Sequence, residues 1–184
     1  MFGLFEIPKP VNEPIFNYSK GTPEASELKA KIAELKSGEI EIPLLINGKE
    51  VHTGNFGYAS SPHNHGHRLA RFHKAGEKEI NTAISAAMNA KKVWDKFSYS
   101  ERASIFMRAA EMLSTSWRST INAATMLCQS KNVYQAEIDA VALSQLLARQ
   151  AGGAQEPLDR LVWRADAGAL SLVAAVALGG RQPL

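Results

Sequence analysis

Apolar residues at helical spacing recur in four consecutive segments between residues 77 and 140, and this pattern constrains the fold more than any other. A stripe of apolar residues on one face is typical of a helix that packs against another element. The second segment also begins with Ser98 and Glu101 at the spacing of a capping box. The pattern therefore predicts a mostly helical region. Its stripe residues are Ile80, Ala83, Ile84, Ala87 and Trp94, then Ala103, Phe106, Ala110 and Leu113, then Trp117, Ile121, Ala124 and Cys128, then Val133, Ala136 and Ala140.

The beginning of the chain predicts an arm followed by a helix. Residues 1–20 are rich in Pro and Asn, and we expect them to extend over a larger surface. Thr22 followed by Pro23 is a helix start, and the apolar residues of 24–36 share one face. Ser37-Gly38 then ends the predicted helix.

After residue 41 the apolar pattern changes to that of short strands. Asn47-Gly48 supplies the two residues with positive φ that a tight type I′ turn requires, which predicts a β-hairpin. Further strands are expected near residues 56–60 and 68–73. The chain is therefore predicted to have an α/β fold: an amino-terminal arm, a helix, short hairpin strands and a mostly helical segment.

Residue usage changes abruptly at residue 141. Residues 1–140 contain 48 Phe, Tyr, Met, Ile, Asn or Lys, whereas residues 141–184 contain none. At the frequency found in residues 1–140, the last 44 residues would contain about fifteen of these six residue types. We predict a boundary here, with residues 141–184 forming a tail that is either a low-complexity extension or a stretch translated in another reading frame. Leu143, Leu146 and Leu147 have helical spacing, so the alternative is a non-enzymatic interaction module whose tail is a partner-binding helix.

Composition excludes several classes of protein. A net charge of +3 with scattered Lys and Arg gives no footprint for nucleic acid. The longest apolar run, residues 170–178, is too short to cross a bilayer, and the start of the chain does not resemble a secretory signal. Cys128 is the only cysteine, which excludes an internal disulfide and suits a reducing compartment. We therefore expect a cytoplasmic protein that binds neither nucleic acid nor membrane.

Residues 61–67 read SPHNHGH and raise the question of a metal site. His63, His65 and His67 would point to one face of a strand, and His73 follows six residues later. A proline and a glycine within the stretch favour a turn, and no Cys, Asp or Glu lies between residues 59 and 75 to complete a ligand shell. We interpret the stretch as a polar turn between strands and expect no metal.

Two other residues are candidates for chemistry. Cys128 lies seven residues after Ile121 on an apolar stripe, with no histidine nearby in the sequence, so we interpret it as a small buried hydrophobe. Glu137 flanks the apolar stripe of the fourth segment, where a carboxylate needs a partner. One hypothesis is a structural hydrogen bond or ion pair with Lys131, and the other is contact with a polar substrate. No dinucleotide fingerprint or P-loop motif occurs in the chain.

Three stretches resemble a known family: EIPLLINGKEVHTG (41–54), the stretch from SPHNHGH to RAAEML (61–113), and INAATMLCQSKNVYQAEIDA (121–140). They are similar to the amino-terminal part of the aldehyde dehydrogenase superfamily, and more narrowly to its 1-pyrroline-5-carboxylate dehydrogenases. The resemblance runs from about residue 5 to residue 140. In this family SPHNHGH corresponds to a structural turn without metal.

The resemblance implies an NAD-dependent homo-oligomeric enzyme that oxidises L-glutamate γ-semialdehyde, a small-molecule substrate, to glutamate in proline degradation. Such enzymes use a cysteine thiolate, hydride transfer to NAD and a glutamate general base. Their catalytic and nucleotide-binding motifs are expected beyond residue 140, and the tail's ALGGRQP has Ala177 where that glutamate would stand. The resemblance also matches Glu137 to a residue lining the substrate pocket.

These expectations lead to a prediction for the chain by itself. We predict no catalytic residue, no NAD site, an incomplete nucleotide-binding domain and no activity alone. The helical faces would lack the sheet on which the family buries them. Leaving several hundred Å² of apolar surface uncovered forfeits on the order of 10 kcal/mol, so we expect marginal folding.

Overall fold

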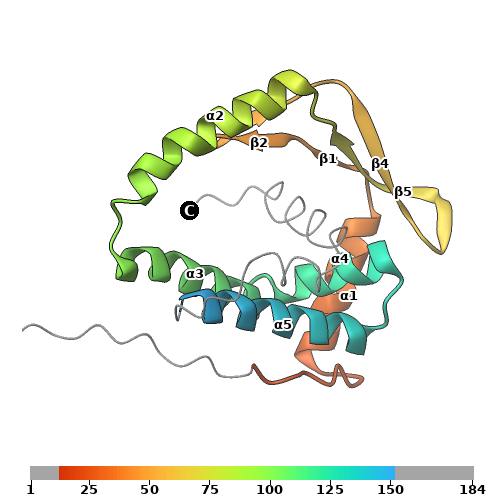
Figure 1. The fold of residues 1–184 in the computed structure, drawn as a ribbon. Coiled ribbons are helices and arrows are strands. Elements are labelled where there is room, and N and C mark those ends of the chain that lie inside the picture. The colour runs from red at the N-terminus through yellow and green to blue at the C-terminus, as the bar shows by residue number, and fades with distance from the viewer. Residues whose placement is uncertain (1–12, 152–184) are drawn as a thin grey trace, which may run out of the picture.

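The computed structural model describes residues 13–151 (Figure 1). Strands β1 to β5 and helix α2 lie on one side of the molecule, and α1, α3, α4 and α5 lie together on the other. This mixed arrangement confirms the predicted α/β fold. The predictions for residues 1–12 and for the tail beyond residue 151 lie outside the described residues.

The first helix, α1, spans Pro23–Lys36 as its start signals predict. The Thr22 hydroxyl oxygen accepts a hydrogen bond from the backbone N–H of Ala25 at 3.4 Å, and Pro23 occupies the first turn. Leu28 and Leu35 are buried against α4. Residues 13–19, which precede the helix, have no regular secondary structure, as expected of an arm.

Two small sheets follow α1. Strands β2 (Leu44–Ile46) and β3 (Lys49–Val51) form the predicted antiparallel hairpin, and φ is 53° at Asn47 and 72° at Gly48. In the second sheet, β5 (Asn64–His73) is the central strand. It pairs in parallel with β1 (Ile40–Ile42) and antiparallel with β4 (Phe56–Ser61).

The turn predicted for residues 61–67 is much shorter than expected. Only Pro62 and His63 lie between β4 and β5, and β5 already begins at Asn64. The register pairs Ser61 with Asn64 and Ser60 with Arg68, with an irregularity between them. Strand β5 therefore begins before the glycine, and the polar turn interpretation is wrong for His65 and His67. These residues lie in the irregular stretch of β5 between the two pairs.

Helices α2 (Glu77–Trp94) and α3 (Tyr99–Ser114) follow the sheets. The predicted capping box of α3 is present: Glu101 N–H donates to Ser98 Oγ at 3.3 Å, and Ser98 N–H donates to a Glu101 carboxylate oxygen at 2.7 Å. Helix α2 has no buried residue, and Ile80 and Ile84 remain 51% and 56% exposed. The predicted exposure of apolar helical surface is therefore confirmed for α2.

Helices α4 (Arg118–Gln129) and α5 (Val133–Ala151) form a hairpin that carries most of the core. Ser130, with φ of 53°, ends α4 in the left-handed conformation and lets the chain reverse. Helix α5 continues for eleven residues past residue 140, where the tail was predicted to begin. No helix within residues 13–151 is long and apolar enough to cross a membrane. The core residues are Leu28, Leu35, Leu69, Ile121, Ala123, Ala124, Leu127 and Ala140.

Candidate functional site

Glu137 lies in the second turn of α5 and is fully buried, with 0% of its surface exposed. Its neighbours on the buried face of the helix are Ala136 and Ala140. Because the chain reverses at Ser130, this face packs against α4. The sequence therefore places a carboxylate inside the helical half of the molecule, where it requires polar partners.

Five hydrogen bonds satisfy the Glu137 carboxylate, and all come from this chain. Oε1 accepts from the backbone N–H of Phe16 at 2.9 Å, and Oε2 accepts from the Tyr18 hydroxyl at 2.8 Å. Asn122 Nδ2 donates to Oε2 at 2.7 Å. Arg118 donates through Nε to Oε2 at 3.3 Å and through Nη2 to Oε1. We call these five residues the arm latch, because they join the arm to α4 and α5.

Arg118 is the cation of the arm latch. It is only 5% exposed, and its guanidinium lies 4.0 Å from the centre of the Phe16 ring. It also donates to the carbonyl oxygen of Pro14. A buried guanidinium placed on an aromatic face and paired with a carboxylate fixes the arm by both charge and stacking.

The latch shifts the pKa values of two of its members. Burial alone would raise the pKa of Glu137, but hydrogen bonds from Arg118 and then from Phe16, Tyr18 and Asn122 outweigh it, so the pKa lies below its ordinary value. Burial, followed by the bond to Glu137, raises the pKa of Tyr18 well above that of a free phenol. At neutral pH the latch therefore pairs a charged carboxylate with a protonated phenol.

Glu137 makes the structural hydrogen bonds and ion pair of the first hypothesis, but its partner is not Lys131. Lys131 Nζ instead contacts Asp139 Oδ2 at 2.6 Å, and both side chains are partly exposed. Arg118, which the sequence analysis did not single out, takes the place of Lys131. Only the packing of two helices brings Arg118 to Glu137, and no local pattern in the sequence indicates that pair.

Asn122 leaves one polar atom of the latch without a partner. Its side chain is fully buried, and Oδ1 has no hydrogen-bond donor within the described part of the chain. The orientation of the amide follows from its other contacts, since only Nδ2 can donate to Glu137 Oε2 and to the Tyr18 hydroxyl oxygen at 2.8 Å. The arm latch therefore offers an incoming group one unused buried acceptor, while its carboxylate is already saturated.

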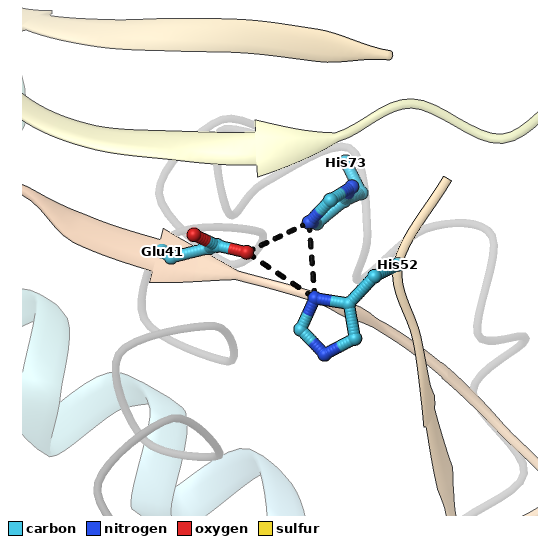
Figure 2. Close-up of side chains that lie close together, drawn as sticks. All are labelled: Glu41, His52 and His73. Atoms are coloured by element: carbon cyan, nitrogen blue, oxygen red, sulfur yellow. Dashed lines mark hydrogen bonds and ion pairs between the residues drawn. The ribbon is translucent and has the colours of Figure 1, made fainter. Parts of the chain in front are cut away.

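The four histidines of the predicted histidine-rich region do not lie together. His63 is in the tight turn and contacts Ser61 and Ser130, while His65 and His67 belong to β5. The cluster that does form joins His73 to Glu41 and His52 (Figure 2). Neither residue is indicated by the local sequence, because parallel pairing of β1 with β5 brings Glu41 to His73, and the segment after β3 brings His52.

The three side chains of this cluster form a nearly equilateral triangle. His52 Nδ1 lies 3.2 Å from both Glu41 Oε1 and His73 Nε2, and His73 Nε2 lies 3.1 Å from Glu41 Oε1. Ligands about 2.0 Å from a tetrahedral zinc ion are separated by roughly 3.3 Å, so the distances alone would suit a metal.

The contacts of the second His73 nitrogen argue against a metal at this triangle. Nδ1 accepts the backbone N–H groups of Thr53 at 3.0 Å and Gly54 at 3.1 Å. These donors require a lone pair on Nδ1, so the proton of the neutral ring is assigned to Nε2, the atom that would have to bind the metal. Arg71 also contacts the second oxygen of Glu41. The cluster therefore fits a hydrogen-bonded clamp between β1, β5 and the segment after β3.

The clamp lowers the pKa of the Glu41 carboxyl to about 2. The hydrogen bond from His73 makes the largest contribution, and the bond from Arg71 follows. Glu41 is therefore ionised throughout the neutral range, and His73, Arg71 and His52 stabilise its charge.

Cys128 packs against the hydrophobic core at the end of α4. Burial raises the pKa of its thiol to about 11. A thiol with this pKa is protonated at neutral pH and is a poor nucleophile. Cys128 therefore packs as a small hydrophobe, as predicted, but it is half-buried and not fully buried.

The junction between β5 and α2 lacks the free N–H groups that bind a pyrophosphate. Anions bind at a helix N-terminus that follows a strand, where free backbone N–H groups point at the ligand. At the start of α2, which follows β5, Gly76 N–H instead donates to the Glu79 carboxylate at 2.9 Å. Glu77 adds a second negative charge to this turn. The Gly76 N–H at this strand-to-helix junction is therefore already used, while Lys74 and Lys78 balance the charge of the two glutamates.

Sequence comparison relates the chain to one enzyme family. The sequence profile of the aldehyde dehydrogenase family matches residues 55–180, which reaches 40 residues past the boundary predicted at residue 140. Delta-1-pyrroline-5-carboxylate dehydrogenase of Agaricus bisporus is 42% identical over 139 residues, which are 75% of this chain and 26% of that protein. The human mitochondrial protein of the same name is 43% identical over 134 residues, which are 73% of this chain and 24% of the relative.

Solved structures give the same relationship. A crystal structure of the Delta-pyrroline-5-carboxylate dehydrogenase from Mycobacterium tuberculosis superimposes with a TM-score of 0.80 and 38% identity, and covers 84% of this chain. A structure from the same organism bound with NAD has a TM-score of 0.79 and 36% identity. The match covers 29% and 31% of those two chains. This chain therefore spans about a quarter to a third of the length of the proteins it matches.

Proposed function

Because the chain belongs to the aldehyde dehydrogenase family, we propose that residues 13–140 take the place of the amino-terminal part of a 1-pyrroline-5-carboxylate dehydrogenase. The intact enzyme would oxidise L-glutamate γ-semialdehyde to glutamate with NAD. The main support is identity of about 40% to proteins of this name, together with the TM-score of 0.80.

The reaction needs a hydride acceptor, a nucleophile and a folded framework, and the described residues suit only the last of these. NAD, when held by the complete enzyme, accepts a hydride. The nucleophile must be a reactive thiolate, and the packed, protonated thiol of Cys128 does not suit that role. We therefore propose that this chain contributes architecture: the arm latch holds residues 14–18 against α4 and α5, and the clamp at His73 holds the strands.

For Glu137 we propose a role near the substrate, through the unpartnered Oδ1 of Asn122 beside it. A saturated carboxylate recruits no new donor without losing one of its present bonds. The buried Asn122 acceptor has no donor among the described residues, and an ammonium or amide group of a small amino-acid-like molecule would satisfy it. The pair of residues would then position a substrate while the arm latch keeps its own bonds.

The proposal is tested with a chimera of this chain and a matched relative. Residues 13–140 replace the corresponding segment of the Agaricus bisporus enzyme, and NADH formation from pyrroline-5-carboxylate is followed at 340 nm. We expect activity within about tenfold of the parent, since neither the nucleophile nor the NAD site is changed. A soluble, folded chimera that binds NAD but has no activity would refute the assignment.

The same chimera separates the two roles of Glu137 and Asn122. Asn122→Leu removes the Oδ1 acceptor with little change in volume. An unchanged kcat with a KM for pyrroline-5-carboxylate that rises more than in Glu137→Gln supports a substrate contact. An unchanged KM in a folded protein refutes that contact and leaves a structural role only. Glu137→Gln serves as the comparison, because it weakens the arm latch while keeping the shape of the side chain.

By itself the chain is proposed to be inactive and not to bind NAD. Isothermal titration of the purified chain with NAD tests this directly, and binding in the micromolar range would contradict it. A homo-oligomeric intact enzyme and a cytoplasmic location remain proposals. Several relatives, including the human one, are named as mitochondrial.

A further inference from the structure

Asn47 and Gly48 form the tip of the hairpin between β2 and β3, and only here in the sequence does an asparagine precede a glycine. Both residues are exposed. The Asn47 side chain has no hydrogen-bond partner within residues 13–151. The space beside Gly48 is open, since nothing lies within 4 Å of the position that a Cβ would take. The Asn47 amide is therefore accessible to water and is not held by any described residue.

An asparagine followed by glycine is chemically reactive without an enzyme. The backbone nitrogen of Gly48 attacks the side-chain carbonyl carbon of Asn47, so an N–Cγ bond forms, the Cγ–Nδ2 bond breaks, and ammonia leaves with the proton of the backbone amide. Water then opens the resulting succinimide ring at either carbonyl and gives aspartate or isoaspartate, with no oxidant or reductant involved. Glycine favours the attack because it carries no side chain that would shield its nitrogen.

The closed turn keeps the two reacting atoms apart. The φ of 53° at Asn47 and of 72° at Gly48 is that of a type I′ turn. In this conformation the Gly48 nitrogen points away from the Asn47 side chain, so the ring closes only when the turn opens. Strands β2 and β3 have three residues each and form a two-stranded sheet. A hairpin of this size is marginally stable, and local opening costs little free energy.

We propose that Asn47 is a site of self-modification, which converts to aspartate and isoaspartate at a rate set by the opening of this hairpin. The reaction uses only Asn47, Gly48 and water, so it is independent of the proposed enzyme function. Asp-Gly also suits a type I′ turn, so the aspartate product keeps the hairpin and lowers the net charge by one from +3. Isoaspartate adds a carbon to the backbone and breaks the pair of Ile46 with Lys49.

Peptide mapping of the full chain by mass spectrometry tests the site. The chain is incubated at pH 8 and 37 °C, and the deamidation of each asparagine is followed over time. Conversion at Asn47 is expected to be roughly tenfold faster than at Asn55, which is also exposed and outside a helix but precedes Phe56. Conversion at Asn47 that is no faster than at Asn55 would overturn the proposal.

The role of the hairpin is tested with a variant that loosens it. Lys49→Gly weakens β3 at an exposed position and leaves the core intact, so conversion at Asn47 is expected to rise about threefold. The urea-unfolded chain is expected to convert faster still. Equal rates in the folded, variant and unfolded chains would refute control by hairpin opening.

Hydrogen exchange separates the two products. Asn47→Asp is expected to protect the backbone amides of β2 and β3 as well as wild type does, whereas the isolated isoaspartate form exchanges them faster. The same protection in the isoaspartate form as in Asn47→Asp would refute the predicted break in the hairpin.

Discussion

Replacing Glu137 with alanine removes the centre of the arm latch and leaves its partners buried. Arg118, 5% exposed, loses its counter-ion, and donors on Phe16, Tyr18 and Asn122 lose their acceptor. Breaking a buried ion pair from one side costs about 3–5 kcal/mol. With a urea m-value of about 1.5 kcal/mol/M, the unfolding midpoint is expected to fall by roughly 2–3 M.

Asp139→Ala is the matched control for this change. It also removes an acidic residue of α5 from an ion pair, but the pair with Lys131 is partly exposed and is worth at most about 1 kcal/mol. Urea unfolding followed by circular dichroism compares the two variants. Trypsin cleavage after Lys20 gives a second measurement. Lys20 is exposed but lies in a turn beside the latched arm, and release of the arm is expected to speed cleavage only in Glu137→Ala. Equal losses of stability in the two variants would refute the arm latch.

Three other outcomes are expected. Because the pKa of Glu137 is lower in the folded state, its contribution to stability is present above about pH 4.5 and is lost as the pH falls through the folded-state pKa. Wild type is therefore expected to lose stability relative to Glu137→Gln between pH 5 and pH 3. Parallel pH profiles of the two proteins would contradict this. Cys128, with a pKa of about 11, is expected to react with a thiol reagent at pH 8 more than tenfold more slowly than in the urea-unfolded chain, and equal rates would show that it is not packed. Calorimetric titration with Zn²⁺ is expected to give the same weak binding for wild type and His73→Ala, because His73 Nε2 carries the proton. Tight zinc binding in wild type that is lost in His73→Ala would contradict the clamp.

The sequence predicts those parts of the fold that depend on interactions between residues only a few positions apart. Asn47-Gly48 forms its turn because both residues accept positive φ, and Ser98 caps α3 because Glu101 is three residues away. The turn predicted for residues 61–67 was too long because the prediction used local residues only. Pro62 does mark a turn, but pairing of β5 with β4 decides where the strand begins.

The candidate site depends on contacts that no local pattern contains. Glu137 was identified as a carboxylate that needs a partner, which the structure confirms, but the partner lies in the preceding helix. The donors on Phe16 and Tyr18 are separated from it by 121 and 119 residues. The cluster likewise depends on the parallel pair of β1 with β5, which brings Glu41 to His73, and on the segment after β3, which carries His52. Charge or spacing in the sequence does not indicate which segments become neighbours.

The long separation between the arm and Glu137 has a consequence during translation. Phe16 and Tyr18 leave the ribosome well before their acceptor, since about 120 further residues must be added first. At 5–20 residues per second this delay is on the order of ten seconds. The strands and α1 are able to fold within that interval, whereas the arm must wait for α5. Nascent chains stalled before codon 137 should therefore carry an undocked, protease-sensitive amino terminus.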